Sequence, residues 1–191
     1  GAGLMAAGTA AMANDNINVV LLEQDPDEPC NTEIASNFIP AAGTRFQREA
    51  GVHDAADVFA SDVMDKNGRR GNPEIIQSFC LCAAEAVHHL ADAFGVDIEF
   101  APELTWVGHS NRRLHAHPTR GGPPIVSRLR EHIGMQKNVT ILNHARATGL
   151  ILEGGTVVGV TGEKAGRSLR IGAECVALTT GGFSANKYML A

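Results

Sequence analysis

The chain opens with Gly1-Ala2-Gly3-Leu4-Met5-Ala6, and the run Asn18-Val19-Val20-Leu21-Leu22, apolar from Val19 on, ends at Glu23. Glycines at positions 1 and 3 and a small residue at position 6 match the turn that joins a strand to a phosphate-binding helix. Glu23 follows Gly3 by 20 positions (23 − 3), the interval expected for an acid that binds ribose hydroxyls. These segments predict a dinucleotide site, and the acid favours NAD or FAD over NADP.

The residues between these motifs predict one helix and one strand. Leu4–Ala13 is rich in Ala and Met, which favours a buried helix whose N-terminus faces the phosphates and whose Ala6 packs closely on the sheet. Ile17–Leu22 predicts a strand buried on both faces, as in a parallel sheet. We also expect a strand before Gly1 and further chain after Ala191, so that the sequence is a fragment of a longer protein.

Composition excludes several classes of partner. The 191 residues are 44% hydrophobic with a formal net charge of −5, which gives no reason to expect nucleic acid or a membrane surface as partner. The four cysteines lack zinc-ligand spacing, and we expect them to be buried, reduced thiols in a cytoplasmic protein. Cys80 and Cys82 are expected to point to different sides of a helix.

The middle of the chain is predicted to be helical and its last third to be rich in strands. Asn31–Thr44 is expected to be a loop near a ligand, and the segment 103–124 an irregular polar stretch. The predicted helices are Asp54–Lys66, Pro73–Phe94 and Ile125–Met135. The predicted strands are Val96–Phe100, Val139–Leu142, Ala147–Leu152, Val157–Thr161, Ser168–Ile171 and Cys175–Leu178.

Gly154-Gly155 indicates a hairpin between two of these strands. An NAD-type Rossmann domain would continue with further strand–helix units instead of a β-meander. The meander therefore shifts the interpretation from NAD towards FAD.

Five blocks in order along the chain resemble the flavoprotein family of fumarate reductase and succinate dehydrogenase, which includes L-aspartate oxidase and 3-ketosteroid Δ1-dehydrogenase. The resemblance implies an α/β fold, a Rossmann-like FAD-binding domain over residues 1–191 with a parallel sheet plus a β-meander, without its first strand and capping domain. The blocks are Gly1–Leu4, Leu21–Glu23, Asn31-Thr32 with Ala41–Thr44, Gly108–Ser110 with Arg113 and His115, and Thr180–Phe183 with Asn186.

The resemblance implies a role in FAD binding for each matched position. On the adenosine side these are Gly1, Gly3 and Leu4 along the pyrophosphate, Glu23 at the ribose and Ala147 at the adenine. On the flavin side they are Asn31 and Thr32 along the cofactor, Ala41, Ala42 and Gly43 at the isoalloxazine, and Thr180 and Gly181 closing on FAD.

The chain departs from the family pattern at two places that bear on the flavin. Membrane-complex members carry a His bonded covalently to FAD where this chain has Asn31, so we expect FAD to be held non-covalently. Pro29-Cys30 and Asn37-Phe38 replace pairs of glycines. A turn there that needs a positive φ would be strained, although Asn tolerates it better than most residues.

Arg113 and His115 are candidates for the substrate side of the site. Arg113 could pair with an anionic substrate through its fork of donors or could form a loop-stabilising salt bridge, and the sequence leaves both open. His115-Ala116-His117 has no acidic or cysteine partner nearby, so no metal site is predicted. His88-His89 is expected to lie on the surface, and Arg69-Arg70 in a solvated turn.

The resemblance implies an FAD-dependent oxidoreductase that transfers a hydride between flavin N5 and a substrate C–C or C=C bond. Its small-molecule substrate would be a dicarboxylate or an enone, and its electron partner is not identified. The family's catalytic acid follows the Thr180–Phe183 block, so no catalytic residue is assigned in this chain. The alternatives are a cofactor-binding module without activity of its own and an NAD-binding Rossmann domain.

Overall fold

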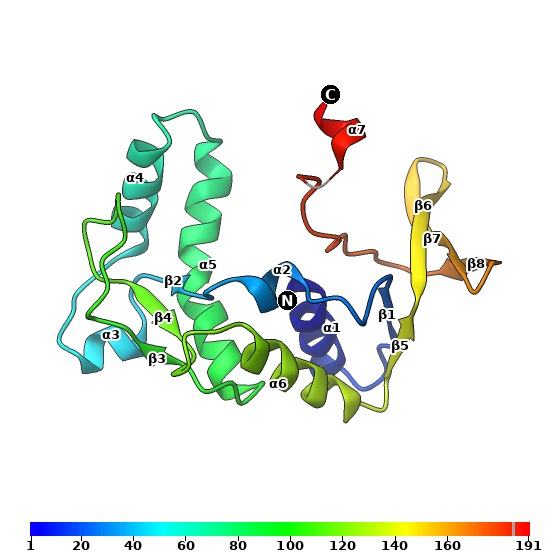
Figure 1. The fold of residues 1–191 in the computed structure, drawn as a ribbon, viewed down its shortest axis with the longest axis horizontal. Coiled ribbons are helices and arrows are strands. Elements are labelled where there is room, and N and C mark those ends of the chain that lie inside the picture. Colours follow the sequence, from blue (N-terminus) through cyan, green and yellow to red (C-terminus); the bar gives the residue numbers. More distant parts are fainter. Residues whose placement is uncertain (185) are drawn as a thin grey trace. The chain divides into compact units, whose positions relative to one another are not determined.

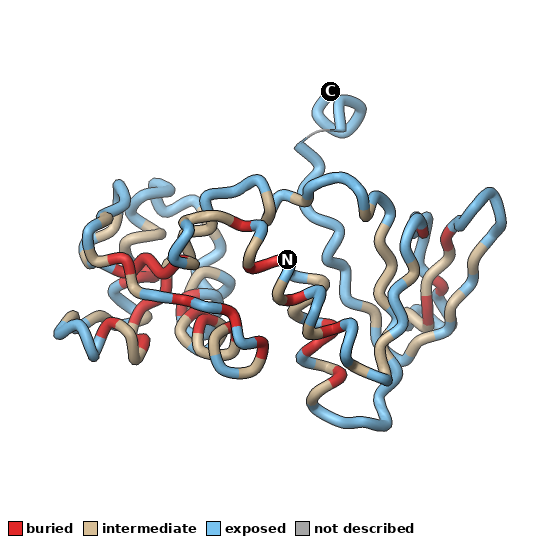
Figure 2. Tube along the Cα trace, turned by 60° about the horizontal axis from the view of Figure 1, so that its bottom comes forward, coloured by how far each residue is buried: buried red, intermediate tan, exposed pale blue. Residues whose placement is uncertain are grey.

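The computed structural model describes residues 1–184 and 186–191, which divide into two compact units (Figure 1). Unit 1 comprises Gly1–Asn31 and Leu129–Ala191, and unit 2 comprises Thr32–Arg128. Each unit contains sheets, helices and buried residues of its own (Figure 2).

Unit 1 begins with the predicted helix and strand. Helix α1 (Ala2–Ala13) buries Ala7 and Ala11 and packs on strand β1 (Val19–Glu23). Strand β1 pairs in parallel with β5 (Val139–Asn143), so the parallel sheet is confirmed. The Asn138 amide donates to the carbonyls of Ala11 and Ile17 at 3.1 and 2.9 Å, which ties the end of the helix to the start of the strand.

Two details of this opening were predicted wrongly. Ala6 is exposed, and the close approach occurs at Gly3, where an added Cβ would lie 3.4 Å from Leu21 Cδ1. Strand β1 is not buried on both faces, because Val20 is 41% exposed. Alternate residues of a strand point to opposite faces, so α1 covers the face that carries Leu21 and leaves the face of Val20 open.

The rest of unit 1 is the predicted β-meander. Strands β6 (Ala145–Glu153), β7 (Thr156–Lys164) and β8 (Arg167–Gly172) form an antiparallel sheet. Gly154 and Gly155 have φ of 57° and 84°, the positive values that a tight hairpin turn requires, so the predicted hairpin is confirmed. The chain ends in α7 (Lys187–Leu190).

The strand predicted at Cys175–Leu178 does not form. A strand needs a ladder partner, and among the described residues no backbone hydrogen bond pairs this segment with a neighbour. Cys175 is also exposed, as is Cys82, whereas Cys80 is buried. The prediction that all four thiols are buried is therefore wrong, although Cys80 and Cys82 do point to different sides of their helix.

Unit 2 is built on two long helices. Helix α4 (Ala56–Lys66) packs on α5 (Pro73–Asp92), and α5 begins with Pro73 in its first turn behind the Asn72 cap, as expected. Between them they bury Phe59, Cys80, Ala83, Val87 and Leu90. Helix α6 (Pro123–Gly134) spans the boundary between the two units at Arg128, and it buries Ile125, Leu129 and Ile133, as its periodicity predicts.

A small antiparallel sheet lies beside these helices, in the order β2 (Ile39–Pro40), β4 (Leu114–Ala116), β3 (Glu99–Phe100). The segments predicted to be loops thus contain β2 and β4, together with α2 (Asn31–Ile34). A further short helix, α3 (Arg45–Glu49), follows β2. Elements of two to five residues are too short to produce a periodic pattern in the sequence.

None of the helices in the described part of the chain combines the length and the apolar character needed to cross a membrane.

The meander allows one direct test of packing. Gly159 and Gly172 face each other in the register of β7 and β8, but an added Cβ would lie 2.1 Å from Ile171 O at Gly159 and no closer than 3.9 Å to any atom at Gly172. We expect Gly159→Ala to lower the free energy of unfolding by about 1–3 kcal/mol and Gly172→Ala to change it by less. Equal urea midpoints for the two variants would contradict the register.

Candidate functional site

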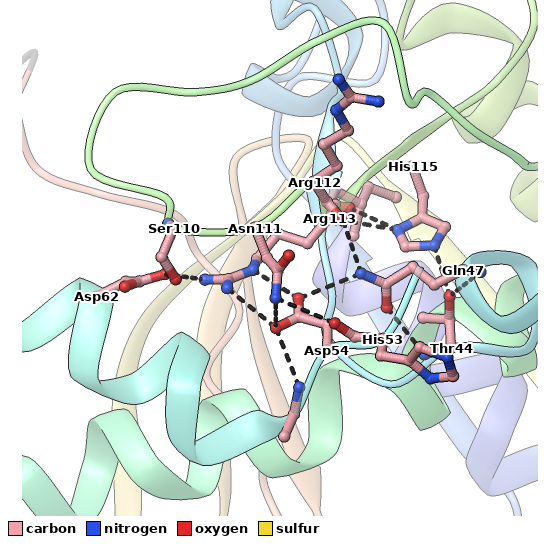
Figure 3. A network of polar contacts seen from close by, with 12 residues as sticks. Thr44, Gln47, His53, Asp54, Asp62, Ser110, Asn111, Arg112, Arg113 and His115 are labelled. Atoms are coloured by element: carbon pink, nitrogen blue, oxygen red, sulfur yellow. Dashed lines mark hydrogen bonds and ion pairs between the residues drawn. The ribbon is translucent and has the colours of Figure 1, made fainter. Parts of the chain in front are cut away.

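A buried arginine lies at the centre of a polar network in unit 2 (Figure 3). Arg113 Nε and Nη2 donate to the two carboxylate oxygens of Asp54 at 2.8 and 3.1 Å, and Nη1 donates to Asp62 at 2.7 Å. The side chains of Arg113 and Asp54 are 0% exposed, and that of Asp62 is 14% exposed. The guanidinium is therefore neutralised by the chain's own carboxylates. Of the two roles that the sequence left open for Arg113, this is the geometry of a structural salt bridge.

Two segments far apart in the sequence bring these groups together. Arg113 directly precedes β4, Asp54 lies just before α4, and Asp62 lies within α4. The guanidinium carbon sits 4.7 Å from the centre of the Phe59 ring, a cation–π contact that also shields the ion pair from water. The network thus fixes β4 against the start of helix α4.

Asp62 is stabilised in its charged form despite partial burial. Burial opposes the charge, but hydrogen bonds from the N–H and hydroxyl of Ser110 and from Arg113 hold the pKa of Asp62 below its usual range. Because three donors converge on one oxygen, the carboxylate orders the 108–111 segment as well as Arg113.

A second part of the network joins Thr44, Gln47 and His115. The Thr44 hydroxyl accepts from the N–H of Gln47 at 3.1 Å, and the Gln47 side-chain oxygen accepts from the N–H of Thr44 at 3.1 Å. This reciprocal pair is a capping box, which starts helix α3. The Gln47 amide donates to Arg112 O at 2.8 Å and to Asp54 at 3.2 Å, so the two parts of the network are continuous.

His115 is fully buried and held as a neutral ring. Its Nδ1 lies 3.1 Å from Arg113 O and 3.3 Å from Ile39 O, so Nδ1 carries the proton. Its Nε2 is then the acceptor for the Thr44 hydroxyl at 2.8 Å. Burial lowers the pKa of His115 to about 4, against the two carbonyls that would raise it.

The chain between β2 and Thr44 presents two backbone donors. The N–H of Ala41 donates to Arg113 O at 2.9 Å. Among the described residues, however, the N–H groups of Ala42 and Gly43 have no acceptor within hydrogen-bonding reach. Gly43 has φ of 77° and is partly exposed, whereas Ala41 and Ala42 are 0% and 4% exposed. Unpaired N–H groups are uncommon in folded proteins, which makes this pair a candidate ligand contact.

Unit 1 contains a second set of open donors, at the start of α1. Helix α1 has Gly1 at its N-cap, no side-chain capping bond and no acidic residue in its first turn. The first N–H groups of a helix lack partners within it and attract anions. Gly3 lies against the segment leading to Thr180 and Gly181, since an added Cβ would meet Thr179 Oγ1 at 2.8 Å. The first and last sequence blocks therefore lie side by side.

The other predicted cofactor residues are dispersed over the two units. Glu23 ends β1, where its carboxylate accepts from the N–H of Asp25 at 3.0 Å, and Ala147 is exposed at an irregularity in β6. Asn31 begins α2 and is exposed. Thr32 contacts Gly122 so closely that a Cβ there would lie 1.8 Å from Thr32 O.

The remaining predictions concern single Asn, Arg and His residues in turns and helices. Asn37 has φ of 50°, the positive value that Asn was expected to tolerate. Arg69 lies in an exposed turn, as expected, and the structure also pairs it with Asp65. His88 was predicted to lie on the surface, but it is partly buried and its Nε2 accepts from the N–H of Arg45 at 3.0 Å. His115 and His117 have separate partners, the latter Thr119 at 2.9 Å.

The family whose sequence pattern matches this chain is described as "FAD binding domain", and the match covers residues 1–191. The chain belongs to the FAD binding domain family. The predicted α/β fold, the FAD cofactor and the resemblance to fumarate reductase flavoproteins are thereby confirmed.

Individual relatives support the same assignment. The FAD binding domain is 30% identical to an NADH:fumarate oxidoreductase of Klebsiella pneumoniae, with 100% of this chain and 20% of that protein aligned. It is 29% identical to a urocanate reductase of Eggerthella lenta, over 99% of this chain and 31% of that protein. The chain thus spans about a fifth to a third of the length of these relatives.

A solved structure shares the fold closely. The open conformation of a flavocytochrome c3 fumarate reductase superposes with a TM-score of 0.88 at 26% identity, over 100% of this chain and 34% of that one. A 3-ketosteroid-Δ4-(5α)-dehydrogenase from Rhodococcus jostii superposes with a TM-score of 0.68 at 21% identity, which shows a shared fold.

Each unit by itself offers open donors of a kind that suits part of FAD. In unit 1 the start of α1, without a side-chain cap, suits a pyrophosphate, and in unit 2 the N–H groups of Ala42 and Gly43 suit the acceptor atoms of a flavin ring. When bound, FAD would supply the redox chemistry, and the protein would supply binding and orientation.

Sequence reasoning missed the residues that hold the N–H groups of Ala42 and Gly43 in place. Thr44 and Gln47 are separated by three positions, the spacing of a capping box, and this signal could have located α3. Asp54 and Asp62 carry no comparable signal, because their common partner Arg113 lies far along the chain.

The buried ion pair predicts an unequal response of two arginines. Arg113→Met would leave Asp54 and Asp62 buried without their cation, and we expect the free energy of unfolding to fall by about 3–5 kcal/mol. Arg69→Met removes an exposed pair with Asp65, whose side chains are 69% and 58% exposed, and should cost at most ~1 kcal/mol. Urea unfolding of both variants measures the difference, and similar losses would contradict the burial of Arg113.

His115 predicts a pH dependence of stability. The folded pKa of His115, about 4, lies below the usual value of 6.5. Between pH ~4 and ~6.5, therefore, His115 is protonated in the unfolded chain and neutral in the folded chain. The free energy of unfolding should therefore be highest above pH ~6.5 and fall by about 2–3 kcal/mol on acidification to pH ~4.5. In His115→Gln this part of the fall should vanish, and identical pH profiles for the two proteins would contradict the account.

Proposed function

We propose that this chain is the FAD-binding part of an oxidoreductase that transfers a hydride between flavin N5 and a carbon of a substrate C–C or C=C bond. The observation that most supports cofactor binding is the uncapped N-terminus of α1 with the Thr179–Gly181 segment beside it. Both are blocks for which the family resemblance implies FAD contacts, and they lie at opposite ends of the sequence.

The proposed substrate class follows from the relatives. Two of them are named for fumarate and urocanate, and both molecules have a C=C bond conjugated to a carboxylate. A solved structure of the same fold contains 4-androstene-3,17-dione, an enone. We therefore propose a small-molecule substrate whose C=C bond is activated by a carboxylate or a ketone.

We propose that FAD is held without a covalent bond. Asn31 occupies the position of the flavin-linked His of membrane-complex members, and an amide is not nucleophilic enough to form such a bond. The described structure instead offers backbone donors, which bind reversibly. The family match to an FAD binding domain leaves the NAD alternative without support.

A second candidate is a cofactor-binding module that has no activity of its own. It is favoured by the positions of Arg113 and His115, the two substrate-side candidates, because both are buried and engaged within unit 2. Turnover of fumarate or urocanate with a reduced dye as electron donor separates the two candidates. Activity supports the oxidoreductase, and its absence from a fully FAD-loaded protein supports the module.

Purification provides the direct test of the cofactor. We expect the purified protein, after incubation with FAD and desalting, to show the visible absorption bands of oxidised flavin. Acid precipitation should release the flavin into the supernatant, since it is not covalently attached. A protein that stays colourless, or a flavin that remains in the precipitate, would contradict the corresponding part of the proposal.

Two glycines provide a matched pair for the same measurement. Gly3→Ala places a Cβ 2.8 Å from Thr179 Oγ1, whereas Gly134→Ala meets no atom within 4 Å. We expect the first variant to raise the Kd for FAD by about tenfold or more and the second to leave it unchanged. Equal Kd values for FAD in the two variants would show that the start of α1 does not contact the cofactor.

A further inference from the structure

The backbone from Ala41 to Thr44 consists of two free peptide groups between two fixed ones. The Pro40–Ala41 peptide is fixed by its N–H, which donates to Arg113 O at 2.9 Å. The Gly43–Thr44 peptide is fixed at both ends, because its carbonyl accepts from Arg48 Nη1 at 2.7 Å and its N–H donates to Gln47 Oε1 at 3.1 Å. Between them lie the N–H groups of Ala42 and Gly43, which have no hydrogen-bond acceptor among the residues that the structure describes.

Thr44 makes one contact more than a helix cap needs. A capping box uses the N–H of Thr44 and a lone pair of its hydroxyl, and Gln47 supplies both partners. The hydroxyl proton is left over, and it is directed to His115 Nε2 at 2.8 Å. The contact joins residues 71 positions apart, so it ties the start of α3 to strand β4.

The orientation of the His115 ring is set by β4 and its neighbour. His115 lies opposite Ile39 in the register of β2 and β4, and its Nδ1–H lies between the carbonyls of Ile39 and Arg113. Arg113 O also accepts from the N–H of Ala41. The same carbonyl therefore fixes one end of the 41–44 segment and, through the His115 ring, the other.

We propose that His115 is a positioning residue for the flavin, which acts through the Thr44 hydroxyl to hold the N–H groups of Ala42 and Gly43 in the direction of the cofactor. This inference rests on the proposed function and on the family resemblance, which implies that this backbone lies at the isoalloxazine. His115 is fully buried and does not itself contact FAD or substrate. In this proposal it sets the direction in which the N–H groups of Ala42 and Gly43 donate.

A positioning role and a purely structural role predict different measurements. If His115 only stabilised unit 2, its loss would lower the unfolding midpoint, and the correctly folded protein would still bind FAD with its original affinity and spectrum. If His115 positions the donors, the folded variant binds FAD more weakly and the flavin absorption bands shift, because hydrogen bonds to the ring alter its electronic states.

The experiment uses the purified protein and measures the Kd for FAD and the spectrum of bound flavin. Thr44→Val removes the hydroxyl at nearly constant shape, and His115→Leu removes its acceptor. Each should raise the Kd by about tenfold, equivalent to about 1.4 kcal/mol, and shift the flavin bands. Thr44→Ser restores a hydroxyl and His115→Gln restores an acceptor near Nε2, so both should recover most of the affinity.

A matched control is available in unit 1. Thr156 is exposed at the start of β7, at the hairpin end of the meander, and Thr156→Val should leave both the Kd and the spectrum unchanged. Circular dichroism at the titration temperature confirms that each variant is folded. If Thr44→Val does not fold, the comparison of His115→Leu with His115→Gln decides the question by itself.

The outcomes separate this inference from the proposed function. A wild-type protein that binds no FAD overturns both. A wild-type protein that binds FAD, with His115→Leu and Thr44→Val equal to it in Kd and spectrum, overturns the positioning role alone. Weakened binding in both variants with recovery in Thr44→Ser and His115→Gln supports it.

Discussion

Burial of the Arg113 guanidinium is the constraint on which unit 2 depends. A charge removed from water must be paired and hydrogen-bonded, and Arg113 meets this requirement with Asp54 and Asp62. The pairing holds β4 against the start of α4. His115, two residues further on, then faces Thr44 in a fixed orientation. A helix as short as α3 is marginal on its own. The hydrogen bonds of this network hold α3 and the short strand β2 in place.

The same structure keeps certain backbone donors open. Among the described residues, most buried polar side-chain groups of unit 2 are hydrogen-bonded, whereas the N–H groups of Ala42 and Gly43 are not, and the first turn of α1 in unit 1 has no side-chain cap. A domain that binds a dinucleotide must offer donors to phosphate and ring acceptors and must keep its own side chains from occupying them. Hydrogen-bonded side chains around peptide N–H groups that lack an acceptor are consistent with that requirement.

Local patterns in the sequence were sufficient to predict the main elements. The helix and strand between Gly1 and Glu23, the helices α4 to α6 and the Gly154-Gly155 turn are all present in the structure. The strand expected at Cys175–Leu178 failed because strand formation depends on a partner that no local pattern reveals. Strand β4 was missed because three residues are too few for a periodicity.

The polar network could not be predicted, because its contacts join residues about 50 to 70 positions apart. The sequence indicates that Arg113 pairs with an anionic group, but it cannot show that the carboxylates of Asp54 and Asp62 are its partners. His115 was singled out as a substrate-side group, and the structure places it in the interior beside Thr44. Burial separates a residue that supports a site from one that touches the ligand, and burial is a property of the fold.

Amide hydrogen exchange with and without FAD tests the central claim most directly, namely that the open backbone donors of each unit are the cofactor contacts. The account predicts that FAD slows exchange in the first turn of α1 and at Ala42 and Gly43, while the exposed surface of α5 around Leu81 is unaffected. A protein that binds FAD but shows unchanged exchange in both of these donor segments would contradict the account.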